Sequence, residues 1–143
     1  MQHISFVMIY LTRRETFNAA HRLFKNEYSD EQNLDIFGKC SNPNWHGHNY
    51  ILFVTIKGDT NQETGLLINL KKLSEIIRAR VIDKIDHKNM NTEVLFMAGK
   101  IASTENLAEA IWNELAEPVS DSSATLHCVR LVETENNYVE YYG

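Results

Sequence analysis

The chain of 143 residues contains only two cysteines and two prolines, and its longest N-terminal apolar stretch is short. Two cysteines are too few for the disulfide framework of a small secreted scaffold, so a reducing compartment is expected. The apolar stretch 4–11 falls well below the roughly 20 residues that a membrane-spanning helix needs. We therefore expect a cytoplasmic protein with no membrane partner.

The sequence also lacks a block of basic residues. Its formal net charge is −5 at pH 7, with 14 Lys and Arg against 19 Asp and Glu. Nucleic acids and anionic membranes attract clusters of Lys and Arg, so nucleic acid is not an expected partner. No repeat or Pro/Gly/Ser-rich linker divides the chain, and its length suits one domain of roughly 100 to 150 residues. We expect residues 1–143 to form a single domain.

The hydrophobic pattern predicts four strands and two helices. β-branched and aromatic residues are concentrated in four segments that we expect to be strands: 4–17, 49–57, 124–133 and 138–142. Apolar residues at helical spacing predict amphipathic helices over 70–85 and 103–115. The order strand, strand, helix, helix, strand, strand indicates an α+β fold. One antiparallel sheet would carry both helices on one face, leaving loops 18–48 and 86–102 free for function.

Three histidines form the most specific local pattern. His46-Gly47-His48 stands directly before an expected strand, where side chains at i and i+2 point to the same face. His21 lies where the preceding strand ends, so a hairpin of the two strands would bring the three imidazoles together. Three protein ligands with an open fourth position are typical of catalytic zinc. A surface turn is the alternative interpretation of this spacing.

Cys40, six residues before His46, has two candidate roles. As a thiolate close to a metal ion it would have a lowered pKa and could act as a base or nucleophile. As a fourth ligand it would close the site and make it structural, so the two roles exclude each other. Cys128 lies within an expected strand and is interpreted as a buried apolar residue.

The remaining candidates are less specific. Asp86 next to His87 could tune proton transfer near neutral pH, although such a pair also occurs commonly in exposed loops. Glu133 ends an expected strand, where a solvated carboxylate is ordinary. His3 and His127 have no chemical partners in the sequence and are interpreted as structural.

Five segments, in this order, resemble the 6-pyruvoyltetrahydropterin synthase family. They are Phe-Asn-Ala-Ala-His (17–21), Phe-Gly-Lys-Cys-Ser-Asn-Pro-Asn-Trp-His-Gly-His-Asn-Tyr (37–50), Asp-His-Lys-Asn (86–89), Ser-Thr-Glu-Asn (103–106) and Glu-Thr-Glu-Asn-Asn (133–137). The resemblance spans nearly the whole chain. It implies the tunnelling fold (T-fold), a four-stranded antiparallel sheet with two helices. It also implies assembly as a trimeric barrel and then, head to head, as a homohexamer.

The resemblance further implies a lyase that converts 7,8-dihydroneopterin triphosphate to 6-pyruvoyltetrahydropterin with loss of triphosphate, with Zn²⁺ and no external redox cofactor. By the matching motifs, zinc is held by His21, His46 and His48. The other implied roles are a base (Cys40), a proton relay (Asp86 and His87), an anchor for the pterin (Glu133) and the lining of the pterin pocket (Ser103, Thr104 and Glu105). The resemblance places the site between subunits, with Cys40 and the Asp86-His87 pair from different chains.

Two departures from the family pattern lie beside the expected ligands. Asn18 stands where a small residue is common, and Trp45 stands where glycine is frequent, so Trp45 could alter the shape of the pocket. The alternative activity is that of 6-carboxytetrahydropterin synthase, on the route to deazapurine nucleosides, which cleaves the side chain of the same substrate. That relative usually has three residues between the cysteine and the His-Gly-His motif. The five residues 41–45 found here favour the pyruvoyl type, and a non-catalytic zinc- or pterin-binding homologue is a third alternative.

Overall fold

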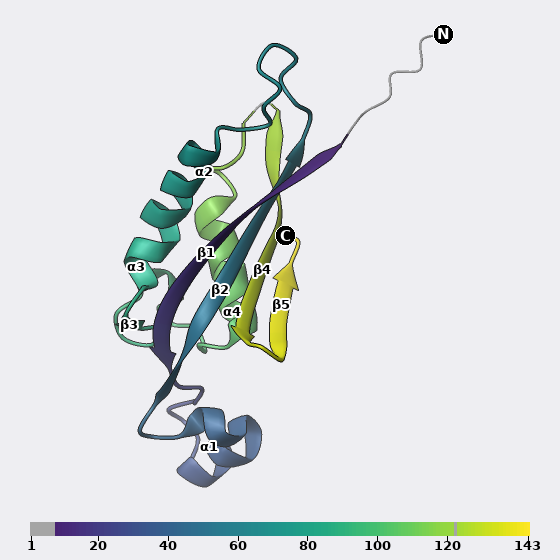
Figure 1. The fold of residues 1–143 in the computed structure, drawn as a ribbon. Coiled ribbons are helices and arrows are strands. Elements are labelled where there is room, and N and C mark those ends of the chain that lie inside the picture. Colours follow the sequence, from purple (N-terminus) through teal and green to yellow (C-terminus); the bar gives the residue numbers. More distant parts are fainter. Residues whose placement is uncertain (1–7, 122) are drawn as a thin grey trace.

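The computed structural model describes residues 8–121 and 123–143 (Figure 1). The elements follow in the order β1 (Ile9–His21), α1 (Asp30–Phe37), η1 (Gly38–Ser41), β2 (His46–Gly58), α2 (Leu70–Ile77), η2 (Arg78–Ile82), α3 (Asp83–Ile85), β3 (Lys88–Asn89), η3 (Leu95–Met97), α4 (Thr104–Leu115), β4 (Ala124–Thr134) and β5 (Asn137–Tyr141). The strands form one sheet in the order β3-β1-β2-β4-β5. The expected α+β class is confirmed.

The long antiparallel pair β1–β2 is the centre of the sheet. Its register runs from Ile9 opposite Gly58 to His21 opposite His46, so both strands extend beyond the bounds 4–17 and 49–57 that the sequence predicts. Residues 4–7 of the expected first strand, and His3, lie outside the described residues. The extension places His21 and the His46-Gly47-His48 motif within regular, paired strand.

The sheet has one strand more than the four that the sequence predicts. The additional strand β3 has two residues, and it pairs in parallel with β1, with Ala19 opposite Lys88. Two residues are too few to carry an alternating pattern of hydrophobicity, so only the tertiary structure reveals this strand. This pairing places the segment after Asp86 beside the C-terminal end of β1.

Helices α2 and α4 begin at polar caps and lie on one side of the sheet, whereas α1 lies beyond the end of the β1–β2 hairpin (Figure 1). Asn69 accepts hydrogen bonds from the first backbone N–H groups of α2, and Ser103 does the same for α4. The predicted helix 70–85 corresponds to the succession α2, η2 and α3. Their apolar stripes cover the sheet with fully buried side chains, among them Leu73, Ile77, Leu107, Ile111 and Leu115. Each such side chain contributes about 1.5 to 3 kcal/mol of hydrophobic stabilisation.

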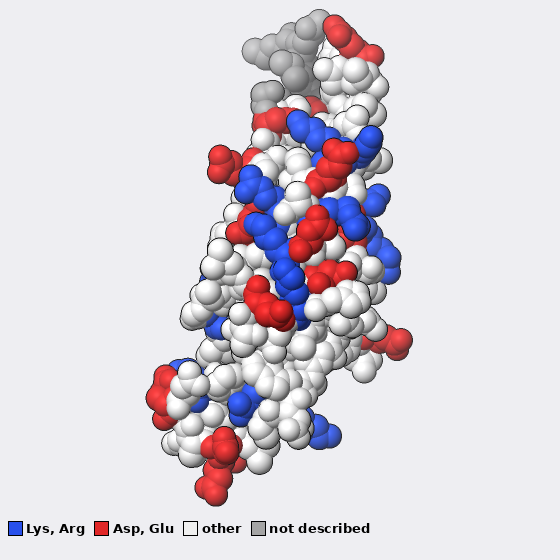
Figure 2. Space-filling model, turned by 90° about the vertical axis from the view of Figure 1, so that its left-hand side faces the viewer, with Lys and Arg blue, Asp and Glu red and all other residues white. Residues whose placement is uncertain are grey.

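The outer side of the helix layer carries charges of both signs. Figure 2 shows Lys and Arg side chains lying among Asp and Glu side chains on this face. Lys71 and Glu75 form an i,i+4 pair on α2, and Lys84 bonds to Glu114 at 2.9 Å across to α4. None of the helices in the described part of the chain is both long and apolar enough to cross a membrane.

Candidate active site

The three histidines meet at the functional end of the β1–β2 hairpin. His21 pairs with His46, and His48 lies opposite the small residue Ala19. One nitrogen from each ring lies within 4.8 Å of the others. Gly47 allows this arrangement, because a Cβ there would lie only 2.9 Å from the carbonyl oxygen of Ala19. The hairpin therefore brings together the three rings that the sequence places on its two strands.

The ring nitrogens of this triad suit a metal ion. Nδ1 of His21 lies 2.7 Å from the carbonyl oxygen of Ala102, so it carries the proton and leaves Nε2 as a free lone pair. Nε2 of His21, Nδ1 of His46 and Nε2 of His48 are buried and have no hydrogen-bond partner among the described residues. Burial also lowers the pKa of His21 and of His46, which favours the neutral imidazoles that bind metals. These residues can hold a metal ion.

A carboxylate lies next to the triad. Oε1 of Glu133, near the end of β4, is 3.8 Å from Nε2 of His48. Its other oxygen, Oε2, accepts a hydrogen bond from the hydroxyl of Thr104 at the start of α4. Ser103 caps that helix through the N–H of Asn106, 3.2 Å away, so its side chain has a structural role. The start of α4 thus holds Glu133 beside the histidines.

A cavity of about 340 Å³ joins these groups. It is lined by His21, Leu23, Cys40, Thr104, Glu105, Glu133, Asn137, Tyr138 and Val139. The last three residues belong to the β4–β5 hairpin, which the sequence predicts as strands 124–133 and 138–142 joined by a tight polar turn at 135–137; none of the three is among the site residues predicted from the sequence. Their signal in the sequence is indirect: they follow Glu133 across a tight turn, so a hairpin returns them to the same end of the sheet.

Cys40 reaches this cavity from η1 and is partly buried. Burial, and then the charge of Glu133, raise the pKa of its thiol above the ordinary value. The backbone oxygen of Cys40 also accepts a bond from the N–H of Leu23, 2.9 Å away. Burial and the charge of Glu133 both favour the neutral thiol, and a nearby cation would act in the opposite direction.

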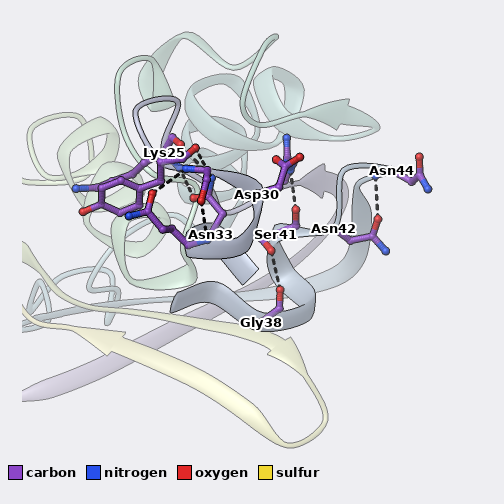
Figure 3. A network of polar contacts seen from close by, with 11 residues as sticks. Lys25, Asp30, Asn33, Gly38, Ser41, Asn42 and Asn44 are labelled. Atoms are coloured by element: carbon purple, nitrogen blue, oxygen red, sulfur yellow. Dashed lines mark hydrogen bonds and ion pairs between the residues drawn. The ribbon is translucent and has the colours of Figure 1, made fainter. Parts of the chain in front are cut away.

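The segment that carries Cys40 is held by polar contacts rather than by a hydrophobic core (Figure 3). The side-chain amide of Asn33 in α1 donates to the carbonyl of Lys25, and its oxygen accepts from the N–H of the same residue. Arg22 donates from Nε to the carbonyl of Ser41 at 2.8 Å. The hydroxyl of Ser41 in turn donates to the carbonyl of Gly38. These bonds fix η1 against the end of β1.

Asp86 and His87 form a pair, but they line a different cavity. Nδ1 of His87 lies 3.0 Å from Oδ1 of Asp86, and the N–H of Asn18 donates to the same oxygen at 2.8 Å. That bond is the main reason why the pKa of Asp86 lies below its ordinary value. The pair borders a cavity of about 630 Å³ together with Arg14 and Asn49. The His87 side chain is 81% exposed, so within one chain it does not join Cys40.

Trp45 lies outside the cavity that contains Cys40 and Glu133. Its backbone has a positive φ of 65°, a conformation that favours glycine, and its ring packs edge-on against Phe24 with centroids 6.2 Å apart. Both rings border a separate hollow of about 560 Å³. The ring of Trp45 therefore does not shape the cavity beside the histidines, in contrast to the expectation from the sequence.

The sequence is similar to known proteins over almost its whole length. Residues 10–143 match the model of the family described as 6-pyruvoyl tetrahydropterin synthase. The chain is 44% identical over 135 residues to 6-pyruvoyl tetrahydrobiopterin synthase of Dictyostelium discoideum, covering 94% of this chain and 96% of the relative. It is 42% identical over 135 residues to the Homo sapiens protein of the same name, covering 93% and 90%.

A more distant relative and a solved structure are also similar to this chain. The 6-carboxy-5,6,7,8-tetrahydropterin synthase of Haemophilus influenzae is 25% identical over 154 residues, covering 94% of this chain and 99% of that protein. The structure of the Caenorhabditis elegans 6-pyruvoyl tetrahydropterin synthase superimposes with a TM-score of 0.87 at 32% identity, covering 96% of this chain and 97% of the other.

Proposed function

Because this chain belongs to the 6-pyruvoyl tetrahydropterin synthase family, we propose that it is a zinc-dependent lyase acting on 7,8-dihydroneopterin triphosphate. The products are 6-pyruvoyltetrahydropterin and triphosphate. The observation that carries the proposal is that His21, Cys40 and Glu133 line one cavity, while the ligand atoms of His46 and His48 lie within 4.8 Å of that of His21. A metal site, a candidate base and a carboxylate for substrate recognition then act on one bound molecule.

The metal would be held by His21, His46 and His48. Among the described residues, the group whose ligand atoms lie within 4.8 Å of one another comprises these three and does not include Cys40. Three ligands leave a side open, as in catalytic zinc sites. Bound zinc would supply Lewis acidity, polarising the oxygens of the substrate side chain and acidifying the neighbouring C–H bonds.

Cys40 would act as the base. It lines the cavity without joining the ligand group, which supports a role in proton transfer over that of a fourth ligand. A nearby cation opposes the effect of Glu133 and lowers the pKa of the thiol, so the loaded site favours the thiolate. The thiolate then takes a proton from the substrate side chain, and the resulting thiol can return it.

Glu133 would anchor the pterin ring. A carboxylate can accept two parallel hydrogen bonds from the amino and ring N–H groups of the pterin edge, and such charge-assisted pairs reject rings that lack those donors. The hydroxyl of Thr104 orients the carboxylate, and Glu105 lies on the wall of the same cavity. Ser103 contributes by capping α4, which fixes the position of Thr104.

Asp86 and His87 would serve a neighbouring subunit as the proton relay. Within one chain the pair is exposed and borders a cavity of its own, so it is available to a second copy. We therefore propose a homohexamer, built as two trimers, in which Cys40 and the Asp86-His87 pair of different chains complete each site. Assembly is then a condition of activity.

The alternative product is that of a 6-carboxytetrahydropterin synthase. The same histidines and thiol would serve that reaction, and relatives with this name match at 25% identity. The five residues between Cys40 and His46, and the identities of 42 to 44% to the pyruvoyl-type proteins, favour the first activity.

Mass spectrometry of the products tests the proposal. The full chain is loaded with zinc and given 7,8-dihydroneopterin triphosphate, with His46→Ala as the control that loses zinc and turnover. A pyruvoyl product with free triphosphate supports the proposed activity. A carboxy product with acetaldehyde supports the alternative, and unchanged substrate with zinc-loaded hexamer contradicts both.

A further inference from the structure

Tyr50 continues the row of histidines into the core. On β2, side chains at alternate positions share a face, so His46, His48 and Tyr50 follow one another on the helix-covered side. Phe17 is the register partner of Tyr50, and the two rings stack at 5.0 Å with an interplanar angle of 14°. The Tyr50 ring meets His48 edge-on at 5.6 Å and His21 at 6.3 Å. Tyr50 thus supports two of the three expected metal ligands.

The hydroxyl of Tyr50 makes no hydrogen bond in the part of the chain that the structure describes. The residue is fully buried, and its oxygen has no hydrogen-bond partner among the described residues. Burying a phenol without a hydrogen bond is costly, and such groups in folded proteins call for a specific explanation. Phenylalanine would fill the same space next to Phe17 without this cost. This cost points to an acceptor other than the described residues.

The surroundings of Tyr50 indicate where that acceptor lies. Four other buried side-chain atoms have no hydrogen-bond partner among the described residues, and three of them belong to the triad: Nε2 of His21, Nδ1 of His46 and Nε2 of His48. The fourth, Nε of Arg130, lies 3.8 Å from a carboxylate oxygen of Glu140. Orphaned donors and acceptors gathered at one place share one explanation, a ligand that satisfies them together.

We propose that Tyr50 is a positioning residue of the metal centre, whose hydroxyl donates a hydrogen bond to the oxygen atom that completes the coordination of the metal held by His21, His46 and His48. That oxygen would come from water or from the substrate side chain. Residues that hydrogen-bond to the ligands of a metal orient those ligands, and the loss of such a residue commonly weakens metal binding by roughly 10- to 100-fold. The inference rests on the metal site of the proposed function.

The variant Tyr50→Phe tests this role because it removes only the hydroxyl. In the metal-free full chain, loss of a buried donor without a partner raises Tm, by roughly 3 °C or more. With zinc, the same change weakens binding roughly tenfold or more in a competition with a chelating dye. The absorption bands of the Co²⁺-substituted protein shift as well. A merely structural tyrosine would change the metal-free and the loaded chain equally.

Tyr10→Phe is the matched control, because Tyr10 is an exposed tyrosine near the start of β1, beside His127. It should leave Tm, zinc affinity and the Co²⁺ spectrum unchanged. A lower Tm of metal-free Tyr50→Phe, or unchanged zinc affinity, overturns the proposal. Zinc binding and turnover of the unaltered chain are measured in parallel. If they are present while Tyr50→Phe has no metal-dependent effect, this inference fails and the proposed function stands; if the unaltered chain binds no zinc, both fail.

Discussion

Oε1 of Glu133 lies 3.8 Å from Nε2 of His48, and Oε2 of the same carboxylate accepts a hydrogen bond from the hydroxyl of Thr104. Both side chains of the His48–Glu133 pair are 19% exposed, so the contact is partly shielded from water but open to the cavity. Thr104 therefore fixes the orientation of a carboxylate that lies beside the expected metal ligands, on the wall of the cavity proposed to bind the substrate.

Thr104→Val keeps the shape of this side chain and removes its hydroxyl. We expect KM for the pterin substrate to rise roughly tenfold, because a hydrogen bond to a charged group contributes about 1.5 to 3 kcal/mol. Zinc content should stay the same. Steady-state kinetics and metal analysis measure the two effects, with Thr12→Val, which breaks a bond to Thr55 on the exposed part of the sheet, as the control. Loss of zinc in Thr104→Val would contradict this role.

Cys40→Ala should abolish turnover and retain zinc. A positioned base accounts for roughly a 10²- to 10⁴-fold acceleration, so kcat should fall by that factor. Zinc stays bound because Cys40 does not belong to the ligand group. Cys128→Ala, which alters the other free cysteine on β4, is the matched control for thiol loss. Zinc release from Cys40→Ala would show that the thiol is a ligand.

Asp86 should make stability depend on pH in the acidic range. The N–H of Asn18, and then His87, hold the pKa of this carboxyl below its ordinary value of about 3.9. A lowered folded-state pKa means that the charged form stabilises the fold above the ordinary pKa, and that this stabilisation is lost as pH falls through the folded pKa. The effect is small because the side chain is 38% exposed.

The measurement is Tm of the metal-free chain between about pH 5 and pH 2. Tm of the unaltered chain should fall more steeply than that of Asp86→Asn, and the two curves should converge at the acid end. Asp59→Asn, at an exposed position after β2, should follow the unaltered chain. If Tm of Asp86→Asn falls as steeply with pH as Tm of the unaltered chain, Asp86 is not the group responsible.

Trp45→Gly should leave the identity of the product unchanged, because the ring borders a hollow outside the cavity that contains Cys40. Glycine relieves a left-handed backbone conformation that costs about 1 to 2 kcal/mol in other residues, while the contact with Phe24 is lost. The free energy of unfolding should therefore change by no more than about 1 kcal/mol. Urea unfolding and mass spectrometry of the product test both statements, and a switch to the carboxy product would be the contrary result.

The sequence predicts the parts of the fold that are governed by periodic burial. Helix α4 and the succession from α2 to α3 have apolar stripes against the sheet, and the strands have alternating patterns. The convergence of His21 with His46 follows from the same logic, since the hairpin requires only that the two strands pair. In each case the pattern reflects which side of an element faces the core.

Helix α1 is an element that a pattern of buried apolar residues cannot reveal. Its only fully buried residue is Asn33, and it packs through polar bonds, so it has no apolar stripe to detect. Its capping box, in which Ser29 and Gln32 exchange bonds with each other's backbone, is the local signal that could reveal it. The separation of Asp86-His87 from Cys40 depends on tertiary structure and has no signature in the spacing.

The pair His21–His46 is the last rung of the β1–β2 ladder, at the end where paired strands normally open first. A metal bound by both histidines would hold this end of the two strands together. Because His21 also bonds to the carbonyl of Ala102, the metal would stabilise the segment before α4 as well. Amide hydrogen exchange should therefore report metal loading: protection at the functional ends of β1 and β2 rises with metal, while their opposite ends, near Ile9 and Gly58, exchange as before. Occupancy of the site could then be read from the backbone alone, without substrate.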